Sequence, residues 1–342
     1  MRTAYRCRAY PDQQQQAVLT RTFGCIRVVW NRTLAARHAR WQHQREGTSY
    51  AQTDAALTAM KREQDLAFLS EVSSVSLQQA LRHQHHAFRA FFARRARHPR
   101  FKSRRSRQSA HYTRSAFSMR GGELRLAKTS APLRFVWSWP DVDVTSLNPT
   151  MVVVSREPDG RWYVTFAIDA DAPEPLEPAG HAVGVDLGVK DFAVTSDGER
   201  IANPRHLERK AANLARYQRR LARCRKGSAN RAKARAKVAR AHRKVRDARR
   251  DFLHRASTRL VRGNDVIVID RWYPSSKTCS ACGYLLGELS LSTRHWTCPS
   301  CGSRHDRDIN AAKNILAAGQ AVTACGAGVR HSGTSRVRPA VK

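Results

Sequence analysis

Two pairs of cysteines near the C-terminus constrain the fold of this chain more than any other feature of its sequence. Each pair has the spacing C-x2-C, and fifteen residues separate them: Cys279 with Cys282, and Cys298 with Cys301. Two such pairs at this distance are typical of one tetrahedral Zn²⁺ site, in which each tight turn supplies two thiolates. The turn-forming residues Gly283, Pro299 and Gly302 accompany the pairs. The spacing predicts a zinc ribbon over residues 276–303.

Two other interpretations of the four thiols are a chance distribution and a pair of disulfide bonds. The remaining cysteines are isolated in the sequence: Cys7, Cys25, Cys224 and Cys325. No secretory signal opens the chain, and no apolar run approaches the ~18 residues that a membrane span needs. We therefore expect a reducing, cytoplasmic compartment, where paired thiols are more often metal ligands than disulfides.

The chain is strongly basic. It has 62 Lys and Arg residues against 27 Asp and Glu among 342, which gives a formal charge of +35. Such a charge indicates a polyanionic partner, of which nucleic acid is the commonest, although a ribosomal or membrane-surface protein could share it. The length allows two or three domains.

The N-terminal half predicts a block of helices that is inserted into, or followed by, a small antiparallel β domain. Residues 1–10 predict a strand, and Asp12 is expected to cap the first helix of a block that spans residues 11–96. Further helices are expected over residues 51–61 and 73–95. In the last helix we place four apolar side chains on one face and three histidines on the polar face: Leu77, Leu81, Phe88 and Phe92, and His83, His85 and His86.

Short strands are expected to complete the β domain over residues 97–170. Those strands are residues 123–127, 133–137, 151–155 and 162–168. The turn of the last hairpin is expected at Glu157-Pro158-Asp159-Gly160. The acidic, proline-rich sequence that follows predicts a linker at residues 171–180.

The C-terminal half predicts an α/β domain. Apolar strands are expected at residues 182–188, 192–195, 199–203 and 266–270. Residues 204–263 are helical in character and very basic, with a break at Gly227-Ser228, and this density of charge favours contact with phosphate. A last helix is expected to begin near Asp308, and residues 321–342 are expected to form a disordered basic tail.

Three carboxylates fall at the ends of these elements: Asp186, Asp270 and Asp308. Carboxylate oxygens are the ligands that Mg²⁺ prefers, and two such ions about 4 Å apart can drive phosphodiester hydrolysis. For Asp186 alone, a turn or cap residue is the simpler interpretation. Its place in an apolar strand favours function, because a buried unpaired carboxylate is costly.

Several motifs resemble the TnpB (OrfB) family, whose members are encoded by bacterial insertion sequences and are similar to ancestors of the type V CRISPR effectors. They are VGVDLGVKDFAVTSDG, RWYPSSKTCSACG, WTCPSCGSRHDRDINAAKNIL, and the opening YRCRAYPDQQQQ with RFKSRR. The resemblance extends over nearly the whole chain. Asp186 matches the first catalytic carboxylate of the family, and Asp308 the last.

The resemblance implies an α/β multidomain protein that cleaves DNA with Mg²⁺ under the direction of a guide RNA. The implied parts are a wedge-like β domain (1–10 and 97–170), a helical recognition block (11–96), and an RNase H-like (RuvC) nuclease domain (181–275 and 304–320) that carries the zinc ribbon. It also implies double-stranded DNA as target and a prokaryotic, nucleoid-associated location. For nucleic-acid contacts we select six basic residues: Arg100, Lys102, Arg104, Arg105, Lys277 and Arg307.

The chain departs from the family at the middle carboxylate. Family members resemble one another in a strand that ends in Glu-Asp-Leu, followed by helices and a further strand. Here one strand at residues 266–270 stands for both, so several tens of residues are absent and Asp270 occupies the place of the Glu. Asp is one methylene shorter than Glu, and ~1 Å of misplacement can disable metal chemistry. Glu288 is a conceivable substitute, although we expect it to face solvent.

Four hypotheses follow. The first is an active RNA-guided DNA endonuclease, and the second is a nuclease-dead, guide-directed DNA-binding regulator. The third is a decayed copy with an internal deletion that does not fold stably. The fourth, a generic RNA-binding protein with a zinc ribbon, leaves Asp186 and Asp308 without a role.

Overall fold

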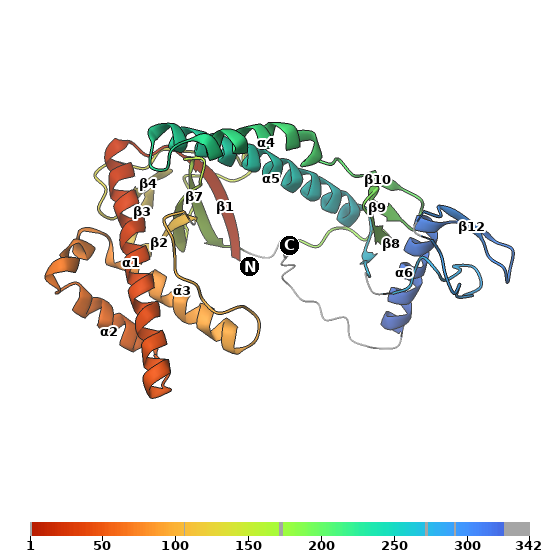
Figure 1. Ribbon diagram of the computed structural model, residues 1–342, viewed down its shortest axis with the longest axis horizontal. Helices are drawn as coiled ribbons and strands as arrows, with labels where there is room; N and C mark the ends of the chain where they lie inside the picture. The colour runs from red at the N-terminus through yellow and green to blue at the C-terminus, as the bar shows by residue number, and fades with distance from the viewer. Residues whose placement is uncertain (1, 106, 171–173, 271–272, 291, 325–342) are drawn as a thin grey trace. The chain divides into compact units, whose positions relative to one another are not determined.

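The computed structural model describes residues 2–105, 107–170, 174–270, 273–290 and 292–324 (Figure 1). The chain divides into two compact units. Unit 1 comprises residues 1–173 and 223–240, and unit 2 comprises residues 174–222 and 241–342. The predicted linker at 171–180 includes the boundary at Pro173, although residues 171–173 lie outside the described part. None of the described helices is both long enough and apolar enough to cross a bilayer.

Unit 1 contains a five-stranded antiparallel sheet with the strand order β2-β6-β7-β1-β5. Its strands are β1 (Arg2–Ala9), β2 (Gln108–Thr113), β5 (Phe135–Val136), β6 (Met151–Arg156) and β7 (Trp162–Asp169). The turn between β6 and β7 forms as predicted, with Gly160 at φ +87° donating its N–H to the carbonyl of Glu157. A separate hairpin consists of β3 (Phe117–Arg120) and β4 (Glu123–Leu126).

The helices of unit 1 are α1 (Gln13–Gln44), α2 (Tyr50–Met60) and α3 (Ser74–Phe92), with short 3₁₀ helices at Gln64–Glu71 and Arg114–Ala116. Asp12 caps α1 as predicted, in a capping box with Gln15. The core lies between α1, α3 and the sheet, where Leu77 and Leu81 are fully buried.

The structure of unit 1 adds to or differs from the sequence predictions in three respects. Strands β2 and β3 were missed, because their short, polar sequences show little apolar alternation. Phe92 lies on the same face of α3 as Phe88, with ring centroids 6.3 Å apart, but it is 68% exposed at the last residue of the helix. His83 is half-buried against the ring of His111, 4.3 Å between centroids, instead of lying on a solvated face.

Unit 2 is built on a four-stranded sheet with the order β10-β9-β8-β11. Its strands are β8 (Ala182–Leu187), β9 (Asp191–Thr195), β10 (Arg200–Ala202) and β11 (Val266–Val268). β8 and β11 run parallel, and the other pairs are antiparallel. β11 is shorter than predicted, so Ile269 and Asp270 lie beyond its end.

Helix α6 (Arg307–Ala324) packs on this sheet against β8, β9 and β11 (Figure 1). Gly184 of β8 allows the close approach, because a Cβ there would lie 2.0 Å from the carbonyl oxygen of Ala312. Gly319 does the same two turns beyond Ala312, where a Cβ would lie 2.5 Å from Val268. The helix continues to Ala324, so the predicted tail begins too early; residues 325–342, with Cys325, lie outside the described part.

The basic segment forms two helices, α4 (Glu208–Arg223) and α5 (Ala229–Gly263), divided near Gly227-Ser228 as predicted. Phe252 and Leu260 of α5 pack against the buried side chains of the unit 2 sheet. The remaining strands, β12 (His295–Thr297) and β13 (Arg304–Asp306), form an antiparallel hairpin around the second cysteine pair.

Candidate metal centres

The two cysteine pairs lie in separate turns that have the same backbone hydrogen bond. In the first, the N–H of Gly283 donates to the carbonyl of Cys279, and in the second the N–H of Gly302 donates to that of Cys298. Both glycines adopt left-handed φ angles, +76° and +70°, which a β-carbon disfavours. The first thiol of each pair is buried and the second is exposed. The two turns therefore place the four thiol groups close together.

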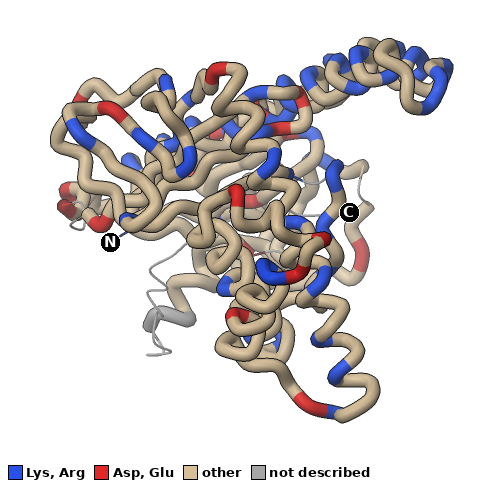
Figure 2. The backbone as a smooth tube through the Cα atoms, turned by 90° about the vertical axis from the view of Figure 1, so that its left-hand side faces the viewer, with Lys and Arg blue, Asp and Glu red and all other residues tan. Residues whose placement is uncertain are grey.

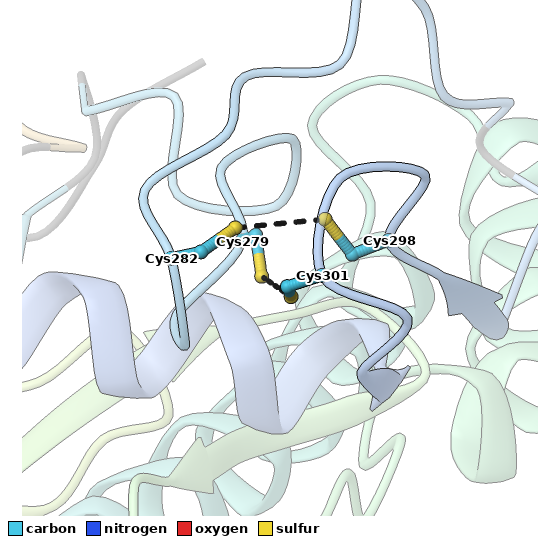
Figure 3. A group of neighbouring side chains, drawn as sticks. All are labelled: Cys279, Cys282, Cys298 and Cys301. Carbon is cyan, nitrogen blue, oxygen red and sulfur yellow. Dashed lines mark hydrogen bonds between the residues drawn. The ribbon is translucent and has the colours of Figure 1, made fainter.

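The four sulfur atoms fit a tetrahedral ion. All lie within 4.8 Å of one another, and the Cys279–Cys301 and Cys282–Cys298 Sγ distances are both 3.7 Å (Figure 3). A zinc ion with Zn–S bonds of about 2.3 Å requires sulfur–sulfur edges of about 3.8 Å. Sulfur atoms at this separation are not joined as disulfides, in which S–S is about 2.0 Å. The cluster is therefore consistent with structural zinc.

Neighbouring side chains support this cluster. The Nε2 atom of His305 lies 3.1 Å from the Sγ of Cys279, and its ring lies against that of Trp296 at 4.7 Å. Burial, and then the charge of Lys313, lower the pKa of His305, which favours the neutral imidazole. This contact was missed in the sequence, where His305 has no metal-ligand spacing to the cysteines.

Two asparagines of α6 join the zinc cluster to the sheet domain. Asn310 and Asn314, one helical turn apart and both buried, each donate from Nδ2 to the carbonyls of Ser275 and Thr278, at 2.6–3.3 Å. The Oδ1 atom of Asn310 accepts the N–H of Ser280, 2.9 Å away, inside the first cysteine turn. Asn310, in the sequence Asp308-Ile309-Asn310-Ala311-Ala312 (D-x-N-A-A), and Asn314, two residues after it, therefore hold the zinc cluster on α6.

The same helix brings Asp308 to Asp186. Asp186 is half-buried near the end of β8, and Asp308 lies in the first turn of α6, which packs on that strand. Burial raises the pKa of Asp186, and the negative charge of Asp308 raises it further, against the opposing charge of Arg307. The two carboxylates predicted from the sequence thus lie close enough to interact electrostatically.

Two arginines surround Asp308, and neither was predicted. Arg200 Nη1 lies 3.6 Å from Asp308 Oδ2, and Arg294 Nη1 lies 3.7 Å from the same oxygen. Arg200 also pairs with Asp191 at 2.9 Å and with Asp306 at 2.7 Å. Partial burial alone lowers the pKa of Arg200, but these carboxylates raise it above its usual value. Asp306 in turn caps α6 by accepting the N–H groups of Asp308 and Ile309.

Asp270 does not join this pair in a compact metal cluster. It is exposed beyond the end of β11 and accepts the N–H of Tyr273 at 3.2 Å. The last residue pair of β11 and β8 is Val268 with Gly184, and Asp270 and Asp186 each follow their member of that pair by two residues along the chain. Over the described residues, the four cysteines are the only group of three or more Cys, His, Asp or Glu placed to share one ion. Glu288 faces solvent, as expected.

The six basic residues selected from the sequence differ in their surroundings. Arg100, Arg104 and Arg105 are exposed in unit 1. The Nζ atom of Lys102 instead lies 4.5 Å from the centre of the Trp30 ring. In unit 2, Lys277 Nζ donates to the carbonyl of Gly287 and Arg307 Nη1 to that of Ser290. Basic residues are frequent in both units (Figure 2).

Three family models match the chain. The OrfB model of IS605, described as "Probable transposase", matches residues 156–273, and that of the Cas12f1-like TNB domain matches residues 257–315. A model described as a helix-turn-helix domain matches residues 1–46. In the structure this last range contains one strand and one long helix, β1 and α1.

Named relatives match over most of the chain. The "Putative RNA-guided DNA endonuclease" of Streptomyces pristinaespiralis is 47% identical, over 96% of this chain and 92% of the relative. The "Putative RNA-guided DNA endonuclease InsQ" of Escherichia coli K12 is 26% identical, over 94% of each. Both alignments, of 376 and 382 positions, are longer than this chain of 342 residues, so each relative has residues without a counterpart here.

Two solved structures also match. One is described as the Cas12f1-sgRNA-target DNA complex, with a TM-score of 0.31, 13% identity, and coverage of 92% of this chain and 99% of the other. The second is a CRISPR-Cas12f ternary complex, with a TM-score of 0.33, 14% identity, and coverage of 89% and 82%. Such TM-scores are too low to establish a common fold. The sequence identity with the Streptomyces relative is decisive: the chain belongs to the TnpB family, OrfB of IS605.

Proposed function

We propose that this chain is an RNA-guided DNA endonuclease that hydrolyses DNA phosphodiesters with Mg²⁺ held by Asp186 and Asp308. The activity is the one that the names of its relatives give. The observation that carries the site is the convergence of these two carboxylates, distant in sequence, at one end of the β8 strand. Guide RNA and a double-stranded DNA target are the partners that this function requires.

The residues around the two carboxylates suit this chemistry. Asp186 is fixed by a central strand and Asp308 by the first turn of a packed helix, so both ligands are held on rigid elements. Arg200 and Arg294 orient the carboxylate of Asp308. Bound Mg²⁺ would supply an activated water and neutralise the charge that develops on the leaving oxygen.

We assign the third carboxylate to Asp270, through the shortened strand β11. The equal offset of Asp270 and Asp186 from the Val268–Gly184 pair supports this assignment, and so do the longer alignments of the two relatives. An internal deletion that fused two strands explains both observations. In the same scheme the antiparallel sheet of unit 1 is the wedge-like domain, its helices the recognition block, and unit 2 the RuvC-like domain.

A direct test starts from the full chain expressed together with the DNA that flanks its gene, so that its RNA co-purifies. Sequencing that RNA defines the guide, and a matching DNA duplex is then incubated with Mg²⁺. We expect cleavage that Asp186→Ala and Asp308→Ala abolish and that the exposed-carboxylate control Asp251→Ala retains. If Asp270 is the third ligand, Asp270→Ala also abolishes cleavage; retained cleavage would contradict its assignment.

The position of Asp270 favours a second candidate, a guide-directed DNA-binding protein without nuclease activity. Its carboxylate is exposed and no compact group of three carboxylates forms within the described residues. Tight, guide-dependent DNA binding without cleavage at any Mg²⁺ concentration supports this candidate. Insoluble or RNA-free protein supports the decayed copy instead.

A further inference from the structure

An aromatic cluster at one end of the helical layer of unit 1 has no role in the proposed nuclease site. It consists of six rings from α1, α3 and the segment after α3: His38, Phe88, Phe91, Phe92, His98 and Phe101. His98 is at its centre, with ring centroids 4.9–5.3 Å from those of His38, Phe88 and Phe91. Phe92 and Phe101 are 68% and 56% exposed.

The exposed Phe101 is held in place by its neighbours. The carbonyl of Arg100 accepts the indole N–H of Trp30 at 2.9 Å. On the other side, Lys102 exchanges two hydrogen bonds with the side chain of Asn31, at 2.8 and 3.0 Å. Backbone on both sides of Phe101 is therefore fixed to α1, while the ring itself faces outward. An exposed aromatic ring on a fixed backbone is a partly preorganised contact surface, because the backbone has little freedom left to lose on binding.

A buried cation at the cluster has two nitrogen atoms without hydrogen-bond partners among the described residues. Arg37 is only 8% exposed, and its guanidinium carbon lies 4.9 Å from the centre of the Phe88 ring. Its Nε and Nη2 atoms are buried and have no hydrogen-bond partner within the described part of the chain. Burial lowers the pKa of Arg37. Leaving a buried charge unpaired is costly, so an acceptor from outside the protein is expected here.

The surrounding sequence excludes an acidic partner within the same stretch. No Asp or Glu occurs between Glu71 and Glu123, whereas Arg and Lys recur throughout. Arg94 adopts a left-handed φ of 54° at the end of α3, a conformation that costs free energy for a residue other than glycine. Aromatic rings among arginines are the combination that binds unpaired nucleotides, with bases stacked on the rings and phosphates paired to the cations.

We propose that this cluster binds unpaired nucleotides of RNA, with a base stacked on Phe101 or Phe92 and Arg37 as a phosphate partner. The choice of RNA rests on the proposed function, in which the guide is the resident nucleic acid and offers single-stranded loops. Duplex DNA is disfavoured as the ligand, because its bases would first have to be unstacked from one another.

The test measures binding of the full-length protein, freed of co-purifying RNA in high salt, to a short labelled oligouridylate without Mg²⁺. Phe101→Ala and Phe92→Ala are each expected to weaken binding about tenfold, as loss of one stacked base predicts. The dependence of affinity on salt should stay unchanged, since no cation is removed. Phe68→Ala, a partly exposed phenylalanine of the same unit, is the matched control and should retain affinity.

Arg37→Leu separates a binding role from a structural one. Replacing an unpaired buried charge by an apolar side chain should raise the unfolding temperature, and in our proposal it also weakens RNA binding about tenfold. Higher stability with unchanged affinity overturns the role of Arg37. If both phenylalanine variants bind oligouridylate as tightly as the unmodified protein, the proposed site is overturned. If the variants lose as much affinity for oligothymidylate as for oligouridylate, the assignment to RNA is overturned. Cleavage is not measured, so these outcomes are independent of the nuclease proposal.

Discussion

The zinc cluster and the acidic site lie in the same unit and are attached to the same helix, but they are assembled in different ways. The cluster needs two short turns within 23 consecutive residues, Cys279 to Cys301, and each turn is encoded by its own Cys-x2-Cys-Gly sequence. The acidic pair needs β8 and α6, more than a hundred residues apart, to pack at close range. Local sequence therefore specifies the first site, and tertiary packing the second.

The two sites also differ in how their charge is balanced. Two thiolates already neutralise one Zn²⁺ ion, so four thiolates around it would carry a net charge of −2, and all four of these ligands come from the two cysteine motifs. Asp308, in contrast, lies next to Arg200 and Arg294. Burial raises the pKa of Asp186, and the charge of Asp308 raises it further. The charge of the acidic pair therefore depends on residues that no motif predicts, whereas the four zinc ligands all belong to the cysteine motifs.

The largest effect is expected from a substitution in the zinc cluster, the site that local sequence specifies. Cys298→Ser removes a buried thiolate, and zinc binding to sites of this kind contributes about 10 kcal/mol or more. We expect zinc content, measured by elemental analysis of the purified protein, to fall from one ion per chain to well below one half. Cys224→Ser, at an isolated cysteine outside the cluster, is the control. Full zinc content in the Cys298 variant would contradict the four-cysteine site.

The next largest effect is expected from a substitution that disturbs the packing of α6 on β8, which brings Asp186 and Asp308 together. Gly184→Ala places a methyl group 2.0 Å from the carbonyl oxygen of Ala312, so α6 must move away from β8. Overpacking of this kind costs about 1–3 kcal/mol. We expect a lower free energy of unfolding in urea with zinc content retained, because the cysteine turns do not depend on that contact. Gly287→Ala, where nothing lies within 4 Å, is the matched control. Equal stability of the two variants would show that the close contact is absent in solution.

A smaller effect is expected from substitutions of Asn310 and Asn314, which connect the zinc cluster to the helix that carries Asp308. Both side chains donate to the carbonyls of Ser275 and Thr278, so either one alone can keep those carbonyls satisfied. Asn310 also accepts from Ser280. Asn310→Ala should therefore cost about 1–3 kcal/mol through the unsatisfied N–H, and Asn314→Ala less. In a double-mutant cycle we expect the pair to cost more than the two single changes added together. Strict additivity would mean that the two amides act independently.

These differences explain what the sequence could and could not predict. The cysteine spacing predicted the zinc cluster, and the apolar run at residues 182–188 predicted β8 with Asp186 in it, because both are local signals. The D-x-N-A-A motif identified Asp308, but the roles of Asn310 and Asn314 depend on where the cysteine turn lies. Arg200 was missed for the same reason: it is a single basic residue among many until β9, β10 and α6 meet.

The smallest effect tests the electrostatics of the acidic pair. Because the pKa of Asp186 is raised in the folded protein, the protonated form is favoured there, and this contribution to stability is present at low pH. It is lost as the pH rises through the raised pKa, so the ionised carboxylate destabilises the fold near neutral pH. Asp186→Asn should therefore raise the unfolding temperature slightly at pH 7 without added Mg²⁺, and the difference should shrink below about pH 4. Added Mg²⁺ should stabilise the unmodified protein more than the variant, since the variant lacks one of the proposed ligands. A variant that is less stable at pH 7 would show that Asp186 makes favourable ionic contacts, and the acidic pair would then be a structural ion-pair network rather than a metal site.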